Sequence, residues 1–226
     1  MKVYVGQTRS HALIQRLLLA EWGEMTCRGE YPPRRHPWAY DNGAFKDWKA
    51  GAQFHVDDFE RDVSRIAAAE VKPDFLVVPD LVAGGLRSLE FSMGWAPQLA
   101  GVAPLYLAVQ DDMTEHDVRP CLEDLAGLFV GGSLAWKIRT GERWVELAHA
   151  VGKPCHIGRV GTLRRVQWAR EIKADSIDSC LPLWSEDNLM RFVEGLGVAT
   201  QSDLWRDENN PWTPPNGFWR GFGVTT

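Results

Sequence analysis

The sequence predicts an α/β fold, a compact (β/α)₈ barrel in a single catalytic domain spanning residues 1–198. Short β-branched runs alternate with segments of helical spacing, which is typical of parallel strands joined by helical crossovers. Eight such runs occur, and the 226 residues lie near the lower limit of length for this barrel, so we expect short loops. An open, doubly wound sheet is the structural alternative.

The expected strands are short apolar runs bounded by turn residues. They lie at residues 2–6, 24–28, 38–43, 74–79, 104–109, 127–131, 154–157 and 176–179.

The helices between these runs have recognisable starts and apolar faces. A stripe made by Phe59, Val63, Ile66 and Ala67 has helical periodicity, and we interpret it as core packing. Residues able to cap helix starts precede several segments. The expected caps are Ser10, a box formed by Thr114 and Asp117, Thr162 and Ser185, and a further helix is expected to begin after Thr140.

The periodicity ends near residue 198. Residues 199–226 contain several tryptophans and prolines, and we expect an extended aromatic tail that packs on the barrel wall. A role for these tryptophans in base stacking is the alternative.

Composition excludes several classes of protein. A hydrophobic fraction of 45% and a charged fraction of 24% are those of a globular protein. The N-terminal residues lack the apolar region of a signal peptide, so we expect a cytoplasmic protein without a membrane span. The four cysteines are scattered, without a Cys-x-x-Cys pair, and are interpreted as free thiols.

The formal net charge of −5 gives no overall basic footprint for nucleic acid. A local basic patch is still compatible with this charge, although surface solvation is the simpler interpretation of each pair. The candidate pairs are Arg34-Arg35, Lys46 with Lys49, and Arg164-Arg165.

Polar or glycine residues follow six of the expected strands. Function in a (β/α)₈ barrel collects at the carboxyl ends of the strands. Any single Asp there has a structural explanation as a turn or cap former, whereas three carboxylates with an amide and glycine pairs favour a binding site. The residues are Asp41, Asp80, Gln110, Gly131 with Gly132, Gly158 with Gly161, and Asp178.

The order of these elements resembles that of the tRNA-guanine transglycosylases. Asp41-Asn42-Gly43-Ala44-Phe45 is similar to that family's Asp-Ser-Gly-Gly-Phe motif, and Asp80 falls where the family has its base-reading aspartate. The other similar segments follow in the family's order over about residues 38–184. They are Val109-Gln110, Gly131-Gly132-Ser133-Leu134-Ala135, His156 to Thr162, and Ile177-Asp178-Ser179-Cys180.

The resemblance implies a base exchange at a nucleoside C1′ through a covalent intermediate. Asp178 is then expected to be the nucleophile, and Asp41 the general acid and base. Asp80 is expected to accept hydrogen bonds from N1–H and the exocyclic amine of the base. The expected remainder of the base pocket is Gln110, Gly131, Gly132 and Ser133, with Tyr106 or Trp136 able to stack on the base.

The chain departs from the family in two places. Members that act on tRNA carry a zinc-binding Cys-x-Cys-x-x-Cys element with a later His, but no Cys follows Cys180 and no His follows His156. We therefore expect neither metal nor cofactor. Asp111-Asp112 replaces the family's Gly-Gly after the glutamine, and we expect it to cap the helix near Thr114 or to contact a cationic C7 substituent.

A compact barrel without the zinc element is similar to the phage-type DNA-guanine transglycosylases. This likeness implies exchange of guanine in DNA for a free 7-deazaguanine such as preQ0, with the base flipped out of the duplex. The expected contacts to the nucleic-acid backbone are Gly158, Arg159, Gly161, Arg164 and Arg165, with help from Lys46 and Arg34-Arg35. The sequence leaves open whether the protein is a homodimer.

Three alternatives remain at this stage. The same exchange could act on tRNA or other RNA. The chain could be a catalytically idle partner subunit that binds nucleic acid, although it retains both Asp41 and Asp178. An unrelated barrel could bind a phosphorylated metabolite through Gly158-Arg159-Val160-Gly161.

Overall fold

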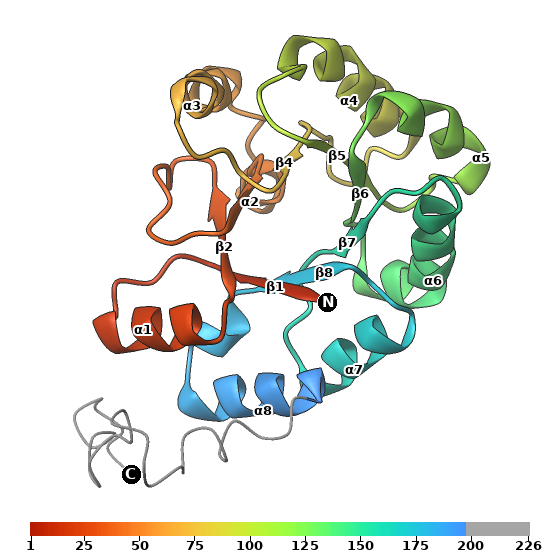
Figure 1. The fold of residues 1–226 in the computed structure, drawn as a ribbon. Helices are drawn as coiled ribbons and strands as arrows, with labels where there is room; N and C mark the ends of the chain where they lie inside the picture. Colours follow the sequence, from red (N-terminus) through yellow and green to blue (C-terminus); the bar gives the residue numbers. More distant parts are fainter. Residues whose placement is uncertain (198–226) are drawn as a thin grey trace, which may run out of the picture.

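The computed structural model describes residues 1–197, which form a closed barrel of eight parallel strands in sequence order (Figure 1). The barrel closes where β8 (Ser176–Ser179) pairs with β1 (Lys2–Val5) over four residues. This closure confirms the predicted (β/α)₈ barrel, and the open sheet is wrong. The expected aromatic tail, residues 199–226, lies outside the described residues.

The strands occupy the expected places with small shifts of their ends. The other six are β2 (Gly23–Cys27), β3 (Trp38–Asp41), β4 (Leu76–Val77), β5 (Leu105–Val109), β6 (Gly127–Val130) and β7 (Cys155–Ile157).

Strand β4 is much shorter than the predicted 74–79. Its regular pairing with β3 is limited to Tyr40 opposite Leu76. Pro79 has no N–H to donate and so cannot extend the ladder. The ends of the predicted run still bond to both neighbours, because the Asp74 N–H donates to Trp38 (2.7 Å) and the Val78 N–H to Tyr106 (3.0 Å).

Helices surround the barrel (Figure 1), but β2 and β3 are joined by residues 28–37 without a helix. The helices are α1 (His11–Leu19), α2 (Ala44–Lys49), α3 (Val56–Ala68), α4 (Leu86–Leu99), α5 (Glu115–Val118), α6 (Leu134–Ala150), α7 (Leu163–Glu171) and α8 (Glu186–Leu196), with 3₁₀ turns η1 (Arg119–Asp124) and η2 (Leu181–Leu183).

Most of the expected caps are confirmed. The hydroxyls of Ser10 and Ser185 accept the Leu13 and Asn188 N–H groups, and Thr114 with Asp117 forms a reciprocal capping box. Thr162 occupies the first position before α7, but its side chain makes no capping hydrogen bond.

The helix start expected after Thr140 is wrong. Helix α6 already begins at Leu134, where the Ser133 hydroxyl accepts the Trp136 N–H. Thr140 lies inside the helix, and its hydroxyl donates to the Trp136 carbonyl at 2.8 Å. The apolar residues after Thr140 therefore continue a helix that starts two turns earlier.

The predicted apolar stripe on α3 is confirmed for Phe59 and Ile66. Phe59 and Ile66 are fully buried, Val63 is half-buried, and Ala67 is exposed. The helix therefore packs through a narrower face than the sequence indicated.

Aromatic rings fill the amino-terminal half of the barrel interior. The Phe75 ring stacks on Tyr106 with centroids 4.2 Å apart, and it meets Tyr4 edge-on at 5.5 Å. His156 stacks on Phe129 at 4.8 Å and also contacts Phe75. Because this half is filled, a ligand can enter only from the carboxyl end of the strands.

Candidate active site

Three aspartates from three strands lie at the carboxyl end of the barrel. Asp41 is the last residue of β3, Asp80 follows β4, and Asp178 is the third residue of β8. All three are half-buried, and their charges affect one another: Asp178 helps to raise the pKa of Asp41, and Asp41 that of Asp80. The structure thus brings together the three carboxylates that the sequence singled out.

Asp178 is held by two donors on one oxygen. Its Oδ1 accepts the Arg159 backbone N–H at 3.0 Å and lies 3.0 Å from His156 Nε2. Its Oδ2 accepts no hydrogen bond from a described residue. Burial alone would raise the pKa of this carboxyl, but the hydrogen bond from His156, with the Arg159 N–H and the Lys137 charge, holds it below its ordinary value. Asp178 is therefore a carboxylate with one oxygen available for chemistry.

His156 is fully buried in the middle of β7, and the sequence analysis gave it no role. Its Nδ1 lies 2.8 Å from the Ser176 hydroxyl, so the ring connects Ser176 to Asp178. Burial lowers the pKa of the imidazole, so the neutral ring is favoured. A neutral ring can donate Nε2–H to Asp178 if Nδ1 accepts from Ser176.

Asp41 differs from Asp178 in its partners. Its Oδ1 accepts the Gly43 N–H at 2.7 Å, and Gly43 adopts a φ of 80°, in the left-handed region, at the turn into α2. Burial raises the pKa of Asp41 to about 6; the Gly43 hydrogen bond lowers it, and the Asp178 charge raises it. A carboxyl with this pKa can both give and take a proton near neutral pH.

Asp80 is oriented by two amides. Asn42 Nδ2 donates to its Oδ1 at 2.9 Å and to the Val78 carbonyl at 2.8 Å, while Gln110 Nε2 lies 3.3 Å from its Oδ2. Burial raises the pKa of Asp80 to about 6, against the lowering effect of the Asn42 hydrogen bond. Asn42 lies inside the motif formed by residues 41–45, but no separate role was predicted for it.

Gln110 has its whole amide occupied. Nε2 donates to Ser88 Oγ at 2.7 Å as well as to Asp80, and Oε1 accepts the Ala83 N–H at 2.6 Å. Only 3% of its surface is exposed. Gln110 therefore positions Asp80 in this structure and has no spare donor for a base.

The glycine pair and Ser133 have different situations. Gly131 continues the ladder by donating to the Val109 carbonyl at 2.8 Å, whereas the Gly132 N–H donates to no described residue. Ser133 is fully engaged, because its N–H and hydroxyl both bond to the Asp111 carboxylate at 2.6 Å. Of these predicted base-binding residues, Gly132 retains an available donor.

The same contacts correct the expectation for Asp111. It does not cap the helix near Thr114, which is closed by its own box with Asp117. Asp111 instead joins the loop after β5 to the loop after β6 through Ser133.

Arg159 crosses the mouth of the site. Its guanidinium lies 4.0 Å from the centroid of the Phe45 ring and donates to the Gly132 carbonyl at 2.7 Å. The side chain therefore connects helix α2 with the loops that follow β6 and β7.

Lys137 is a buried cation that the sequence analysis did not identify. It lies in the first turn of α6, and its ammonium donates to the Gly158 carbonyl. Burial lowers its pKa to about 7, with the Arg159 charge acting in the same direction and Asp178 opposing it. Lys137 thus fixes the loop from which Arg159 reaches Asp178.

The remaining predicted contacts are dispersed. Gly158 and Gly161 are buried, and a Cβ on Gly158 would lie 2.6 Å from Phe129. Arg164 is exposed and Arg165 half-buried on the first turn of α7.

The two candidate stacking residues are part of the barrel wall. Tyr106 stacks inside the aromatic layer, and Trp136 packs beneath Gly132 and beside Trp144.

The described part of the chain holds no group of three or more His, Cys, Asp or Glu side chains suited to a metal ion. No helix among residues 1–197 combines the length and apolar character needed to cross a bilayer.

The fold and the site together define a (β/α)₈ barrel with a carboxylate-lined site at the carboxyl end of its strands. No protein-family model matches the chain, and comparison with curated proteins gives no match. The function must therefore be argued from the site itself.

Proposed function

We propose that this protein is a guanine transglycosylase that exchanges guanine in DNA for a 7-deazaguanine base through a covalent glycosyl-enzyme intermediate. The observation that carries the proposal is the division of the carboxylates into two kinds. Asp178 is held ionised with Oδ2 available, while the pKa of Asp41 is raised to about 6. Carboxyls whose environments separate their pKa values in this way suit a nucleophile and a proton carrier.

The first half-reaction needs both groups. Asp178 Oδ2 attacks C1′, the C1′–N9 bond breaks, and its electron pair leaves with guanine, which takes a proton from the Asp41 carboxyl. In the second half, N9 of the 7-deazaguanine gives its proton to the Asp41 carboxylate and attacks C1′. The bond from C1′ to Asp178 then breaks, and both carboxyls return to their starting states.

Recognition of the base falls to Asp80 and Gly132. The Asp80 carboxylate accepts from N1–H and the exocyclic amine of guanine, and the Gly132 N–H donates to O6. Gln110, whose amide is occupied, holds Asp80 in place. Adenine would leave these polar groups unpaired, which is a strong basis for discrimination.

The experiment that tests the function is an exchange assay on two polymers. Purified protein should release labelled guanine from DNA in the presence of preQ0, and Asp178→Ala should abolish the release. Release from tRNA but never from DNA would contradict the choice of substrate. A denaturation-resistant DNA adduct formed by the wild type and not by Asp178→Asn would test the nucleophile separately.

A further inference from the structure

A cleft of about 540 Å³ opens beside the candidate active site. Residues 7–9, which follow β1, line one wall, and residues 29–34, which follow β2, line the other. Both loops leave the carboxyl ends of their strands, so the cleft opens on the same face as the three aspartates. Glu30 in its wall is close enough for its charge to help raise the pKa of Asp41. We call this feature the β1–β2 cleft.

The β1–β2 cleft is held in shape by the protein itself. Gln7 Nε2, from one wall, donates to the carbonyls of Glu30 (2.7 Å) and Pro32 (3.1 Å) on the other. A cleft fixed by such hydrogen bonds does not need a ligand to form it, which reduces the entropic cost of binding.

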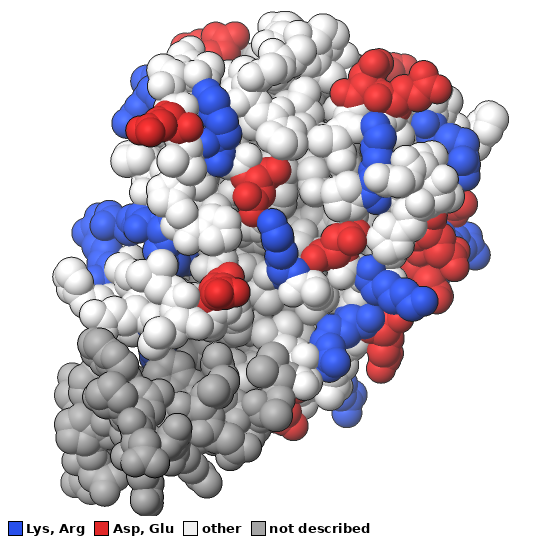
Figure 2. Space-filling model, viewed as in Figure 1, with Lys and Arg blue, Asp and Glu red and all other residues white. Residues whose placement is uncertain are grey.

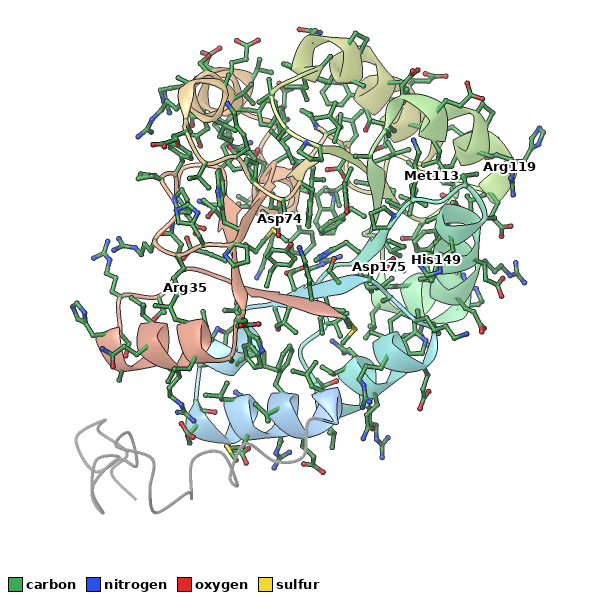
Figure 3. The ribbon with its side chains drawn as sticks, in the orientation of Figure 1. Arg35, Asp74, Met113, Arg119, His149 and Asp175 are labelled. Atoms are coloured by element: carbon green, nitrogen blue, oxygen red, sulfur yellow. The ribbon has the colours of Figure 1, made fainter. Side chains whose placement is uncertain are left out.

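Two exposed arginines, one in each wall, give the β1–β2 cleft its charge. Neither the Arg9 nor the Arg34 guanidinium has a hydrogen bond or ion pair with a described residue, although the Arg34 backbone N–H is fixed by Glu24 at 2.9 Å. The next residue, Arg35, is buried and lies 3.2 Å from Glu24, so its charge is compensated. Seen from the amino end, Figure 2 shows basic side chains gathered at the edge of the molecule just above α1, and Figure 3 labels Arg35 close to the same helix.

Helix α1 adds to the positive potential at this place. It begins at His11, two residues after Arg9, and its first turn contains no acidic residue. The amino end of a helix carries a partial positive charge, which favours an anion nearby. Glu30 is the acidic residue of the cleft lining, and its carboxylate is already bonded to the Cys27 N–H at 3.1 Å.

We propose that the β1–β2 cleft binds a phosphodiester of the nucleic-acid strand, next to the nucleotide whose base lies at the three aspartates. This inference rests on the proposed function and names the contact that holds the strand. Guanidinium groups match phosphate oxygens in geometry and charge. Going around the barrel, Asp178 on β8 is followed by β1 and β2, so a strand leaving the sugar at Asp178 passes directly to Arg9 and Arg34.

The test compares two double variants. Arg9→Gln/Arg34→Gln removes the two cations of the cleft. Arg119→Gln/Arg143→Gln removes two exposed cations elsewhere, and Figure 3 places Arg119 on the side of the barrel opposite Arg35. Binding of a fluorescent single-stranded oligodeoxynucleotide is measured by anisotropy between 50 and 200 mM salt, without free base, and thermal melts check that both variants fold.

The cleft variant should bind the oligonucleotide about tenfold more weakly, because charge-assisted hydrogen bonds are lost. The slope of log K against log salt should become shallower by roughly 0.7 for each phosphate contact removed. The control variant should stay within twofold of the wild type. In the exchange assay the cleft variant should raise KM and leave kcat unchanged.

The outcomes separate this inference from the proposed function. Unchanged affinity and salt slope in the cleft variant would overturn the inference even if exchange proceeds. If the cleft variant bound the oligonucleotide more weakly but the wild type never exchanged guanine, the inference about the cleft would hold and the proposed function would be wrong. Binding of inorganic phosphate or guanosine monophosphate that depends on Arg9 and Arg34, with oligonucleotide binding unchanged, would assign the cleft to a small phosphorylated molecule and overturn the inference. If the Gln variant does not fold, Arg9→Lys/Arg34→Lys keeps the charge and should lose affinity by a smaller factor.

Discussion

The carboxylates at the two ends of the barrel differ in their partners. At the amino end, Asp74 lies 3.3 Å from Lys2, and Asp175 lies 2.8 Å from His149. Figure 3 shows both aspartates at the amino end of the barrel, and Figure 2 shows acidic and basic groups alternating there. At the carboxyl end, the charges of the three aspartates act on one another, and His156 is the only basic side chain in an ion pair with any of them among the described residues.

This difference separates stability from function. The amino-end carboxylates also bind main chain or hydroxyl groups, as Asp175 does with the Cys155 N–H at 2.7 Å and Asp74 with the Tyr4 hydroxyl at 2.5 Å. They close the bottom of the barrel. The carboxyl-end aspartates lie near like charges, which is costly for folding and is typical of a reacting site.

The largest expected effect is a loss of catalytic activity in an aspartate variant at the carboxyl end of the barrel, compared with the same change at the amino end. Asp178→Asn should lower kcat/KM for base exchange by about 1,000-fold or more, because an amide cannot trap C1′. Asp175→Asn, the matched change at the amino end, should stay within about threefold, as surface changes remote from a site usually do. Steady-state kinetics on DNA measure both, and equal losses in the two variants would erase the distinction between the two ends.

Asp41→Asn should lower activity and raise stability. Loss of the proton carrier should cost about 100-fold to 10,000-fold in rate. Because the folded pKa of about 6 lies above the ordinary value of 3.8, the ionised carboxyl disfavours the folded state above pH 6. Removing it should raise the free energy of unfolding at pH 8 by on the order of 1–2 kcal/mol, allowing for partial exposure.

The pH dependence of the stability gained by Asp41→Asn tests whether relief of the buried charge causes it. The gain should shrink as the pH falls from 6 towards 4, since the carboxyl of the folded wild type takes up a proton and loses its unfavourable charge before the unfolded chain does. Urea unfolding at pH 4, 6 and 8 measures it. A gain that is the same at all three values would mean that relief of charge is not its cause.

His156→Leu should have an intermediate effect. It removes the donor to Asp178 Oδ1 and leaves the Arg159 N–H in place, so kcat should fall by about 10-fold to 100-fold. The pKa of Asp178, followed by pH-dependent rates of adduct formation, should rise. Ser176→Ala, which removes the partner on the other ring nitrogen, should give a smaller loss of the same kind. If neither variant changed the pH profile, His156 would contribute only to core packing and not to the pKa of Asp178.

Lys2→Ala should have the smallest effect. Two-thirds of the Lys2 side chain is exposed, and its ion pair with Asp74 is worth at most about 1 kcal/mol. The melting temperature should drop by a few degrees at most, and exchange activity should be unchanged. A large loss of activity would mean that the amino end contributes to the site.

The fold could be predicted because alternating periodicities fix parallel strands and crossovers, and the positions of the three aspartates because strands in a barrel share one carboxyl end. The roles of other residues depend on contacts that sequence spacing does not contain. The Gln110 amide is occupied by Ala83 in the loop after β4 and by Ser88 in α4. The Asp111 carboxylate is bound to Ser133. His156 could have been suspected, because a histidine flanked by Cys155 and Ile157 in a strand faces the barrel interior.

Strand β4 suggests how a ligand would alter the mechanics of the barrel. Regular pairing between β3 and β4 is limited to one register pair, while β5 and β6 share four, so this seam is the easiest to open. Side chains reinforce it, above all Asn42, which reaches from β3 to Val78 and Asp80. A base bound between Asp41 and Asp80 would hold β3 and β4 together. Backbone amides along these two strands should then exchange their hydrogens with solvent more slowly than in the free protein.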